Sequence, residues 1–194
     1  MSRDIKNAKC QDILKAAKTL FWKYGIKRVS VQEICKEAGA SKMTFYRFFD
    51  NKLDLAKTLL DGIFNEGIEE YNAIMAADIP FPEKVQQTLL AKFRNSQDIS
   101  QELIMDLYKN KELGLLEYLE ARGNEMMNRV LDDYEQAQKE GYIRPNIKRE
   151  FIMYQLMKMR EMMIDPNLLG LYNNPQELTM ELTNYFFYGL LERK

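Results

Sequence analysis

A short segment after residue 39 holds the side chains whose types and spacing could do chemistry. Its hydroxyl, aromatic and basic groups are Ser41, Lys42, Thr44, Tyr46, Arg47 and Lys52. Basic and hydroxyl side chains bind phosphate oxygens, and they also hydrogen-bond the edges of bases in the major groove of DNA. The segment therefore predicts contact with a nucleic acid.

The distribution of charge favours the same partner. The whole chain has 28 Lys and Arg residues against 29 Asp and Glu residues, a net charge of -1. Residues 1–52 hold 12 basic and 5 acidic residues, a charge of +7, whereas residues 53–194 hold 16 and 24, a charge of -8. A basic first quarter joined to an acidic remainder predicts an N-terminal surface that meets a polyanion.

Composition excludes several classes of catalytic and metal site. The 194 residues include no histidine, which excludes Ser-His-Asp and Cys-His catalysis and zinc sites built on histidine. Cys10 and Cys35 are too few for a disulfide framework or a four-cysteine metal site. Carboxylates are plentiful, but none forms a motif with a nucleophile or a phosphate loop. We expect no metal, no cofactor and no enzymatic activity.

The sequence also bears on location. The longest apolar run, Tyr185 to Leu191, has seven residues, far fewer than the ~20 that a membrane span needs. The first residues lead into a charged amphipathic stretch rather than a signal peptide. We expect a cytoplasmic protein with no membrane partner.

Three short helices are predicted around the polar segment. An apolar stripe from Ile13 to Tyr24 predicts the first helix, and Gly25 is placed to end it. Ser30 and Glu33 fit a capping box at the start of a second helix, which ends near Ala38-Gly39. Ser41 is a plausible N-cap for a third helix, from Lys42 to about Phe48.

Helices are predicted for the rest of the chain as well. A long fourth helix from about Lys52 to Met75 would span ~36 Å. Further helices are expected at 83–94, 98–109, 112–140, Lys148–Ile164 and Gln176–Glu192. The predicted fold is therefore all-α, with about nine helices. We place a helix-turn-helix domain of three helices at residues 1–52 and a helical effector-binding and dimerisation domain at residues 53–194.

The N-terminal segment resembles the DNA-binding domain of the TetR family of bacterial transcriptional regulators. Two short helices around Gly39-Ala40-Ser41 have the proportions of a helix-turn-helix. The matching residues cover about residues 8–60 and are Gly25, Ser30, Val31, Ile34, Ala38-Gly39-Ala40-Ser41, Thr44, Tyr46, Phe49, Asn51-Lys52 and Leu55. The chain departs from the family pattern at Cys35, Met43, Phe45 and Phe48.

The resemblance implies roles for individual residues. Thr44, Tyr46 and Lys52 would contact backbone phosphates. Lys42 and Met43, with Gln32 from the preceding helix, are candidates for base edges, and Arg47 adds a basic group to the same helix. Ser30 and Ser41 would cap their helices and are placed to reach phosphates. As alternatives, Tyr46 could be a core aromatic, which is our interpretation of Phe49, and Arg47 and Lys52 could be solvated charges.

The acidic remainder predicts a sensor module. Methionine and aromatic side chains on its central helices could line a cavity for a small apolar or aromatic effector. The candidate effector-binding residues are Met105, Tyr108, Met126, Met127, Val130 and Tyr134. A packed helical core would show the same spacing, and for any single residue we favour that interpretation.

The last two long helices predict a subunit interface. In TetR-like proteins these helices pair with their symmetry mates as a four-helix bundle, and the two apolar C-terminal helices here resemble that arrangement. The candidate interface residues are Met159, Met163, Leu178, Leu182, Tyr185, Phe186 and Gly189. A homodimer would bind a double-stranded operator of imperfect palindromic sequence.

We interpret the chain as a ligand-responsive repressor that its effector releases from DNA. One alternative is an activator or architectural DNA-binding protein that needs no effector. A core without a cavity would favour that alternative. The other alternative is a helical enzyme that uses a pair of carboxylates with shifted pKa values.

Overall fold

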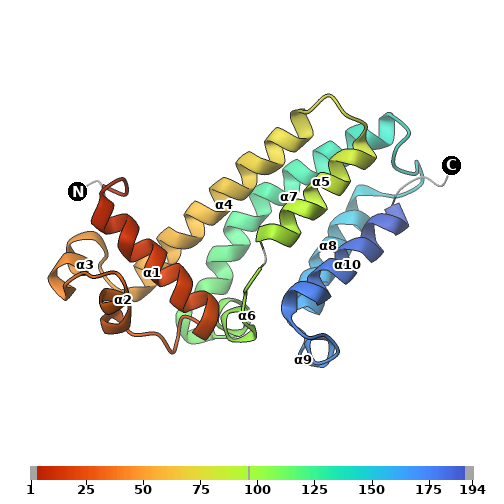
Figure 1. Cartoon of the computed structure of the whole chain (residues 1–194). Helices are drawn as coiled ribbons and strands as arrows, with labels where there is room; N and C mark the ends of the chain where they lie inside the picture. The colour runs from red at the N-terminus through yellow and green to blue at the C-terminus, as the bar shows by residue number, and fades with distance from the viewer. Residues whose placement is uncertain (1–3, 96, 191–194) are drawn as a thin grey trace. The chain divides into compact units, whose positions relative to one another are not determined.

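The computed structural model describes residues 4–95 and 97–190, and every regular element in those ranges is a helix (Figure 1). The chain divides into two compact units. The N-terminal unit runs to Asn65 and includes Asp98–Glu117, and the C-terminal unit combines Glu66–Gln97 with the chain from Tyr118 onward. The prediction of an all-α fold is confirmed.

Helices α1, α2 and α3 form the core of the N-terminal unit, and α1 packs against the other two. The helices of this unit are α1 (Ala8–Tyr24), α2 (Val31–Glu37), α3 (Lys42–Phe48), the first half of α4 (Lys52–Ala76), α6 (Gln101–Tyr108) and the 3-10 helix η1 (Lys111–Leu113). The side chains fully buried among them include Ile13, Phe21, Ile34, Phe45, Phe49 and Leu55. Burial of these apolar groups sets how the three short helices lie together.

The ends of the short helices follow the expected capping chemistry. Gly25 ends α1 with a φ of 77°, and its N–H donates to the carbonyl of Phe21. Ser30 and Glu33 form the predicted capping box at the start of α2. The Ser41 hydroxyl accepts a hydrogen bond from the N–H of Thr44 at the start of α3. The two serine caps satisfy backbone N–H groups that the first turn of a helix leaves without partners.

Helix α6 joins the N-terminal unit through the end of α1 and the loop that follows it. The N–H of Ser100 donates to the carbonyl of Trp22 over 3.0 Å, and the N–H of Lys27 donates to the Asp106 carboxylate over 2.7 Å. The Lys27 ammonium also lies 2.8 Å from the Glu112 carboxylate. These contacts connect segments that are about eighty residues apart in the sequence.

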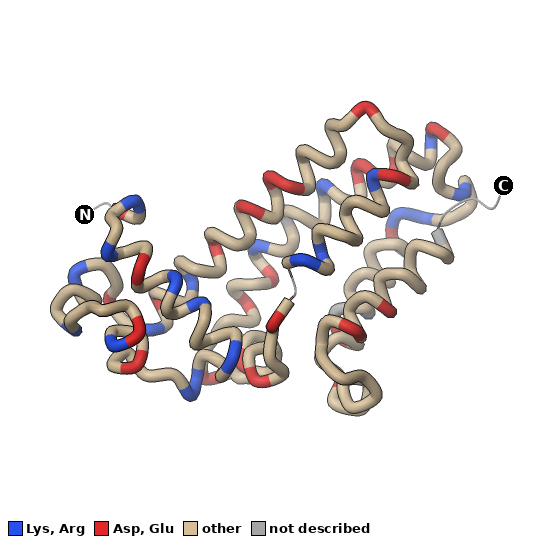
Figure 2. Tube along the Cα trace, viewed as in Figure 1, with Lys and Arg blue, Asp and Glu red and all other residues tan. Residues whose placement is uncertain are grey.

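The acidic residues of Asp98–Glu117 lower the net charge of the N-terminal unit. Lys and Arg mark α1, the following loop and both ends of α3 in Figure 2. Counted over residues 1–65 and 98–117, the unit has 15 basic and 12 acidic residues, a net charge of +3. The charge of +7 over residues 1–52 is thus partly offset inside the same unit.

The C-terminal unit is built around α10, which packs against α5, α8 and α9. Its helices are the second half of α4, α5 (Phe81–Asn95), α7 (Leu115–Lys139) from Tyr118 onward, α8 (Arg149–Met163), α9 (Pro166–Leu169) and α10 (Pro175–Leu190). The buried core cluster includes Phe81, Val85, Leu131, Tyr134, Ile143, Ile152, Leu178, Leu182, Phe186 and Phe187. No helix within the described ranges is both long and apolar enough to cross a lipid bilayer.

The observed elements differ from the predicted ones at several places. The helix expected from residue 112 begins as η1 and continues as α7 only from Leu115. The short helix α9 was not predicted, although the Asp165 side chain caps it and Pro166 opens it, both typical start signals. The last helix is described only to Leu190, so residues 191 and 192 of the prediction lie outside the described part of the chain.

We expect Gly25→Ala to lower the free energy of unfolding by at least about 2 kcal/mol. Gly25 has a φ of 77°, and a Cβ atom there would come within 2.6 Å of the Asp106 carboxylate and 3.3 Å of the Glu102 backbone. Only glycine therefore fits both the backbone conformation at position 25 and the space between α1 and α6. Urea unfolding followed by circular dichroism measures the change.

Gly62→Ala is the matched control. Gly62 lies inside α4, and a Cβ atom there would meet no atom within 4 Å. Alanine is the better helix former, so this variant should be about 0.5–1 kcal/mol more stable than the parent. Equal stability of Gly25→Ala and the parent would contradict the account of the α1–α6 junction.

Candidate nucleic-acid interface

Helices α2 and α3 are joined by the tight turn that a helix-turn-helix requires. Gly39 has a φ of 56°, in the left-handed region that favours glycine. The N–H of Ala38 donates to the carbonyl of Ile34, and the N–H of Ala40 donates to the carbonyl of Cys35, each over 2.9 Å. The turn is therefore closed by backbone hydrogen bonds, and its glycine adopts a left-handed conformation.

Two aromatic residues decide which side of α3 faces inward. Phe45 and Phe49 are both buried, and their ring centroids are 5.7 Å apart. The prediction that Phe49 is a core residue is confirmed. Since each helical residue turns by about 100°, Met43 and Arg47 lie on the opposite side from Phe45. Met43 is 83% exposed, more than any other large apolar side chain that the structure describes as exposed.

The hydroxyl groups of Ser30, Ser41 and Thr44 form hydrogen bonds within the protein. The Ser41 hydroxyl lies 2.9 Å from the Thr44 hydroxyl, in addition to capping the helix. The Ser30 N–H and hydroxyl both donate to the Glu33 carboxylate over 2.7 Å. These bonds lower the pKa of Glu33 below its ordinary value. The predicted capping roles of Ser30 and Ser41 are confirmed, whereas their contacts with phosphates stay predictions.

Other predicted DNA-contacting residues project outward. Gln32 on α2 and Lys42, Tyr46 and Arg47 on α3 are exposed. The Arg47 guanidinium lies 4.6 Å from the centroid of the Phe48 ring, an arrangement that orients an arginine by a cation–π contact. The outward side of α3 therefore combines two basic groups, a phenol and a methionine, on a helix held by its buried aromatics.

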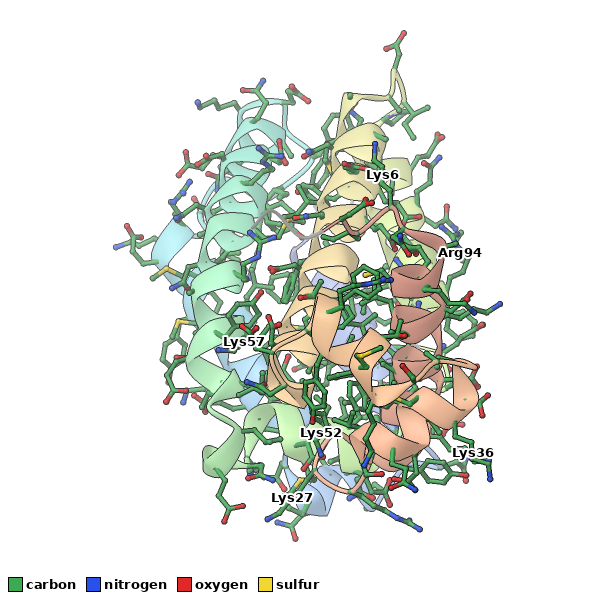
Figure 3. All side chains as sticks on the ribbon, turned by 90° about the vertical axis from the view of Figure 1, so that its left-hand side faces the viewer. Lys6, Lys27, Lys36, Lys52, Lys57 and Arg94 are labelled. Atoms are coloured by element: carbon green, nitrogen blue, oxygen red, sulfur yellow. The ribbon has the colours of Figure 1, made fainter. Side chains whose placement is uncertain are left out.

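Lys52 has a structural role that sequence reasoning missed. Its ammonium donates to the carbonyl of Lys27 over 2.9 Å and to that of Val29 over 2.6 Å, and Lys27 lies beside it (Figure 3). Partial burial lowers the pKa of Lys52, and the carboxylates of Asp106 and Glu33 oppose this shift. Lys52 thus holds the loop between α1 and α2, and its contact with a phosphate stays a prediction.

Cys35 has the environment of a packing residue. Its side chain is buried, and burial raises the pKa of the Cys35 thiol. A raised pKa keeps the thiol protonated and lowers its reactivity. Among the residues that the structure describes, no group of three Cys, Asp or Glu side chains could hold a metal ion.

The predicted effector-binding residues divide between the two units. Met105 and Tyr108 lie on α6 in the N-terminal unit, and Met126, Met127, Val130 and Tyr134 lie on α7 in the C-terminal unit. The Tyr134 ring is buried, with its centroid 5.8 Å from that of Phe81 and 6.1 Å from that of Phe187. Tyr134 thus has the packed-core setting that the sequence left open.

A polar contact near this core was not predicted. The Tyr71 hydroxyl on α4 donates to the Asp133 carboxylate on α7 over 2.9 Å. Burial and this carboxylate raise the pKa of Tyr71. The two residues are 62 positions apart, so only the tertiary structure brings them together.

The predicted interface residues differ in exposure, and Met163 is half-buried against the core of the C-terminal unit. Met159, Leu178, Leu182 and Phe186 are buried within the chain, and Leu178 is only 1% exposed. Such side chains have little surface left for a partner. Tyr185, by contrast, is 82% exposed, and Gly189 is also exposed.

A groove runs between α8 and α10, with a volume of about 460 Å³. Its lining includes Ile147, Phe151, Met162, Tyr185, Phe186 and Tyr188. Sequence reasoning named Tyr185 and Phe186 but missed Phe151 and Tyr188, which are both exposed. Their helical spacing from the predicted residues could have indicated them.

The sequence is similar to known transcriptional regulators. Residues 13–59 match the model of a family described as bacterial regulatory proteins, tetR family. The uncharacterized HTH-type transcriptional regulator YhgD of Bacillus subtilis is 26% identical over 138 residues, which are 69% of this chain and 71% of that protein. The HTH-type transcriptional repressor KstR2 of Mycobacterium tuberculosis is 22% identical over 151 residues, or 75% and 74% of the two chains.

Solved structures share the fold. The ketosteroid transcriptional regulator KstR2 of Mycobacterium tuberculosis superposes with a TM-score of 0.67 at 17% identity, covering 99% of each chain. The fatty acid degradation regulator FadR from Bacillus halodurans gives a TM-score of 0.74 at 18% identity, covering 96% of this chain and 98% of that chain. The arrangement of helices is therefore shared across nearly the whole length.

Lys52→Met should lower the free energy of unfolding by about 1 kcal/mol, because it removes a charged donor from two loop carbonyls. The substitution keeps most of the side-chain length, so it removes hydrogen bonds rather than packing. Urea unfolding of the variant and the parent measures the difference.

Lys15→Met, an exposed substitution on α1, is the control and should change stability by less than about 0.5 kcal/mol. If the two substitutions changed the free energy of unfolding equally, the structure's assignment of Lys52 to hold the loop would be wrong. If Lys52 also neutralises a phosphate, its variant lowers the slope of log affinity against log salt by about 0.9.

Proposed function

We propose that the chain, whose residues 13–59 match the tetR family of bacterial regulatory proteins, is a ligand-responsive repressor that binds a palindromic operator as a homodimer. The observation that carries this proposal is the outward side of α3. Its basic, phenolic and apolar groups project from a capped helix whose inward side is fixed by Phe45. A helix held in this way fits the major groove of DNA.

The turn and the preceding helix support the same function. Gln32 is exposed near the start of α2, where an amide can reach a base edge or a phosphate. The loop before α2 is held by Lys52 and by the contacts of Lys27 with α6. A rigid scaffold of this kind positions base-contacting side chains with little entropy left to lose on binding.

The groove between α8 and α10 supports the proposed dimer. Tyr185 and Tyr188 on α10 are 82% and 77% exposed, and Phe151 on α8 is exposed as well. Aromatic side chains are enriched where subunits meet, because they bury a large area for few lost rotamers. We infer that a second copy of the chain covers this groove about a two-fold axis, with the interface centred on these exposed aromatics.

A two-fold dimer would constrain the operator. Two copies of α3 would lie about one helical turn of DNA apart, ~34 Å, or a multiple of it. The operator would then consist of two half-sites in inverted orientation. Symmetry of the protein thus predicts symmetry of the DNA sequence.

Helix α4 supports a response to a ligand, because it belongs to both units. Its 25 residues continue across the division between Asn65 and Glu66. We propose that a small apolar or aromatic effector binds within the C-terminal unit, near the methionines of α7, and favours a conformation with lower affinity for DNA. The names of KstR2 and FadR, which refer to ketosteroids and fatty acid degradation, agree with an apolar effector.

Selection of bound sequences from random DNA tests the proposed function. We expect an inverted repeat with half-sites one turn apart, or a multiple of it, bound by two copies of the chain. Lys42→Ala should weaken binding to the selected sequence about tenfold or more. Fluorescence anisotropy at fixed salt measures the affinities.

Lys139→Ala, in the last turn of α7, is the matched control and should bind like the parent. Failure to enrich any sequence, or equal effects of the two lysine substitutions, would contradict the proposed function. Addition of apolar metabolites to the bound complex then identifies those that release the DNA.

Tyr185→Glu should dissociate the proposed dimer, because it would bury a charge where the partner packs. Sedimentation velocity of the parent and the variant measures the mass of each. Leu171→Glu is the control, since Leu171 is 75% exposed but does not line the groove. A parent that sediments as a monomer, or a variant that remains a dimer, would contradict the proposed interface.

A further inference from the structure

We propose that Met43 recognises a thymine in each half-site of the operator by packing on its 5-methyl group. This inference rests on the proposed function, since it names the base chemistry that the outward side of α3 would select. It is carried by the placement of one apolar side chain among polar ones, on the side of the helix that points away from the core.

Met43 is not one of the buried core residues of the N-terminal unit. The buried apolar side chains of α3 and of its C-cap are Phe45 and Phe49. Met43 precedes Phe45 by two residues, which places it about 200° away around the helix, and it is 83% exposed. Its side chain is therefore available to a partner and adds little to the fold.

The groups around Met43 leave it as the apolar contact at the start of α3. The Ser41 and Thr44 hydroxyls lie 2.9 Å from each other and complete the cap. The Arg47 guanidinium, one turn further along, lies over the Phe48 ring. Lys42 supplies a charge beside Met43 but no apolar tip.

The major groove offers one apolar group to such a side chain. Every base pair presents hydrogen-bonding groups there, but only thymine adds a methyl group. A thioether placed over a purine N7, a carbonyl oxygen or an amino group would displace water without replacing its hydrogen bonds. Over a thymine methyl it buries apolar area instead, and the flexible methionine side chain adapts to its position.

Replacement of single thymines in the selected operator by deoxyuridine tests this inference. The exchange removes the methyl group and leaves all Watson–Crick and groove hydrogen-bonding groups in place. Each symmetric pair of thymines is replaced in turn, and affinities are measured for the parent, for Met43→Ala and for Lys42→Ala. Met43→Ala should fold normally, because Met43 is exposed and alanine favours helices.

One symmetric pair should depend on Met43. For the parent, deoxyuridine at that pair weakens binding about fourfold for each half-site, the ratio that burial of one methyl group gives. For Met43→Ala the same exchange has no effect. For Lys42→Ala binding is weaker overall, but the deoxyuridine effect keeps its full size.

A gain of affinity provides a second readout. With cytosine in place of that thymine, 5-methylcytosine restores the methyl group at the same place in the groove, and it should improve binding by the parent but not by Met43→Ala. The inference is overturned if no thymine pair shows an effect that Met43→Ala removes, or if the selected half-sites contain no thymine. A chain that selects no sequence at all overturns the proposed function instead, so the two failures are distinguishable.

Discussion

Burial of Phe45 and Phe49 is the interaction on which the outward side of α3, the proposed DNA-binding surface, depends. Once these rings are in the core, the geometry of an α-helix leaves Met43 and Arg47 on the far side of α3. Apolar burial is not directional in itself. When the buried side chains belong to a helix, however, their burial determines where the other side chains of that helix point. Buried residues thus determine which side chains the proposed DNA-binding surface presents.

Two kinds of contact hold this arrangement in place. Local caps at Ser30 and Ser41 set where α2 and α3 begin, and Gly39 sets the turn between them. Distant contacts then fix the loop before α2, through Lys52 and through the bond from Lys27 to Asp106. Because α6 supplies Asp106, the position of the loop depends on a helix outside the three-helix core.

Local features of the sequence predicted much of this, and long-range contacts account for what was missed. The capping box, the turn and the buried Phe49 depend on spacing within a few residues. The attachment of α6 joins residues 79 positions apart, and no pattern along the chain indicates it. Lys52 was interpreted as a phosphate contact by resemblance, yet its ammonium also bonds loop carbonyls, because a lysine has three donors. Periodicity alone could not separate interface residues from core residues on α10, since both are apolar.

Methylation interference tests most directly whether α3 enters the major groove of an operator. Methylation of guanine N7 places a methyl group in the major groove, and methylation of adenine N3 places one in the minor groove. With the selected operator, N7 methylation should block binding at guanines in both half-sites, spaced by a whole number of helical turns. Interference from adenine N3 alone, or from neither modification, would contradict the account.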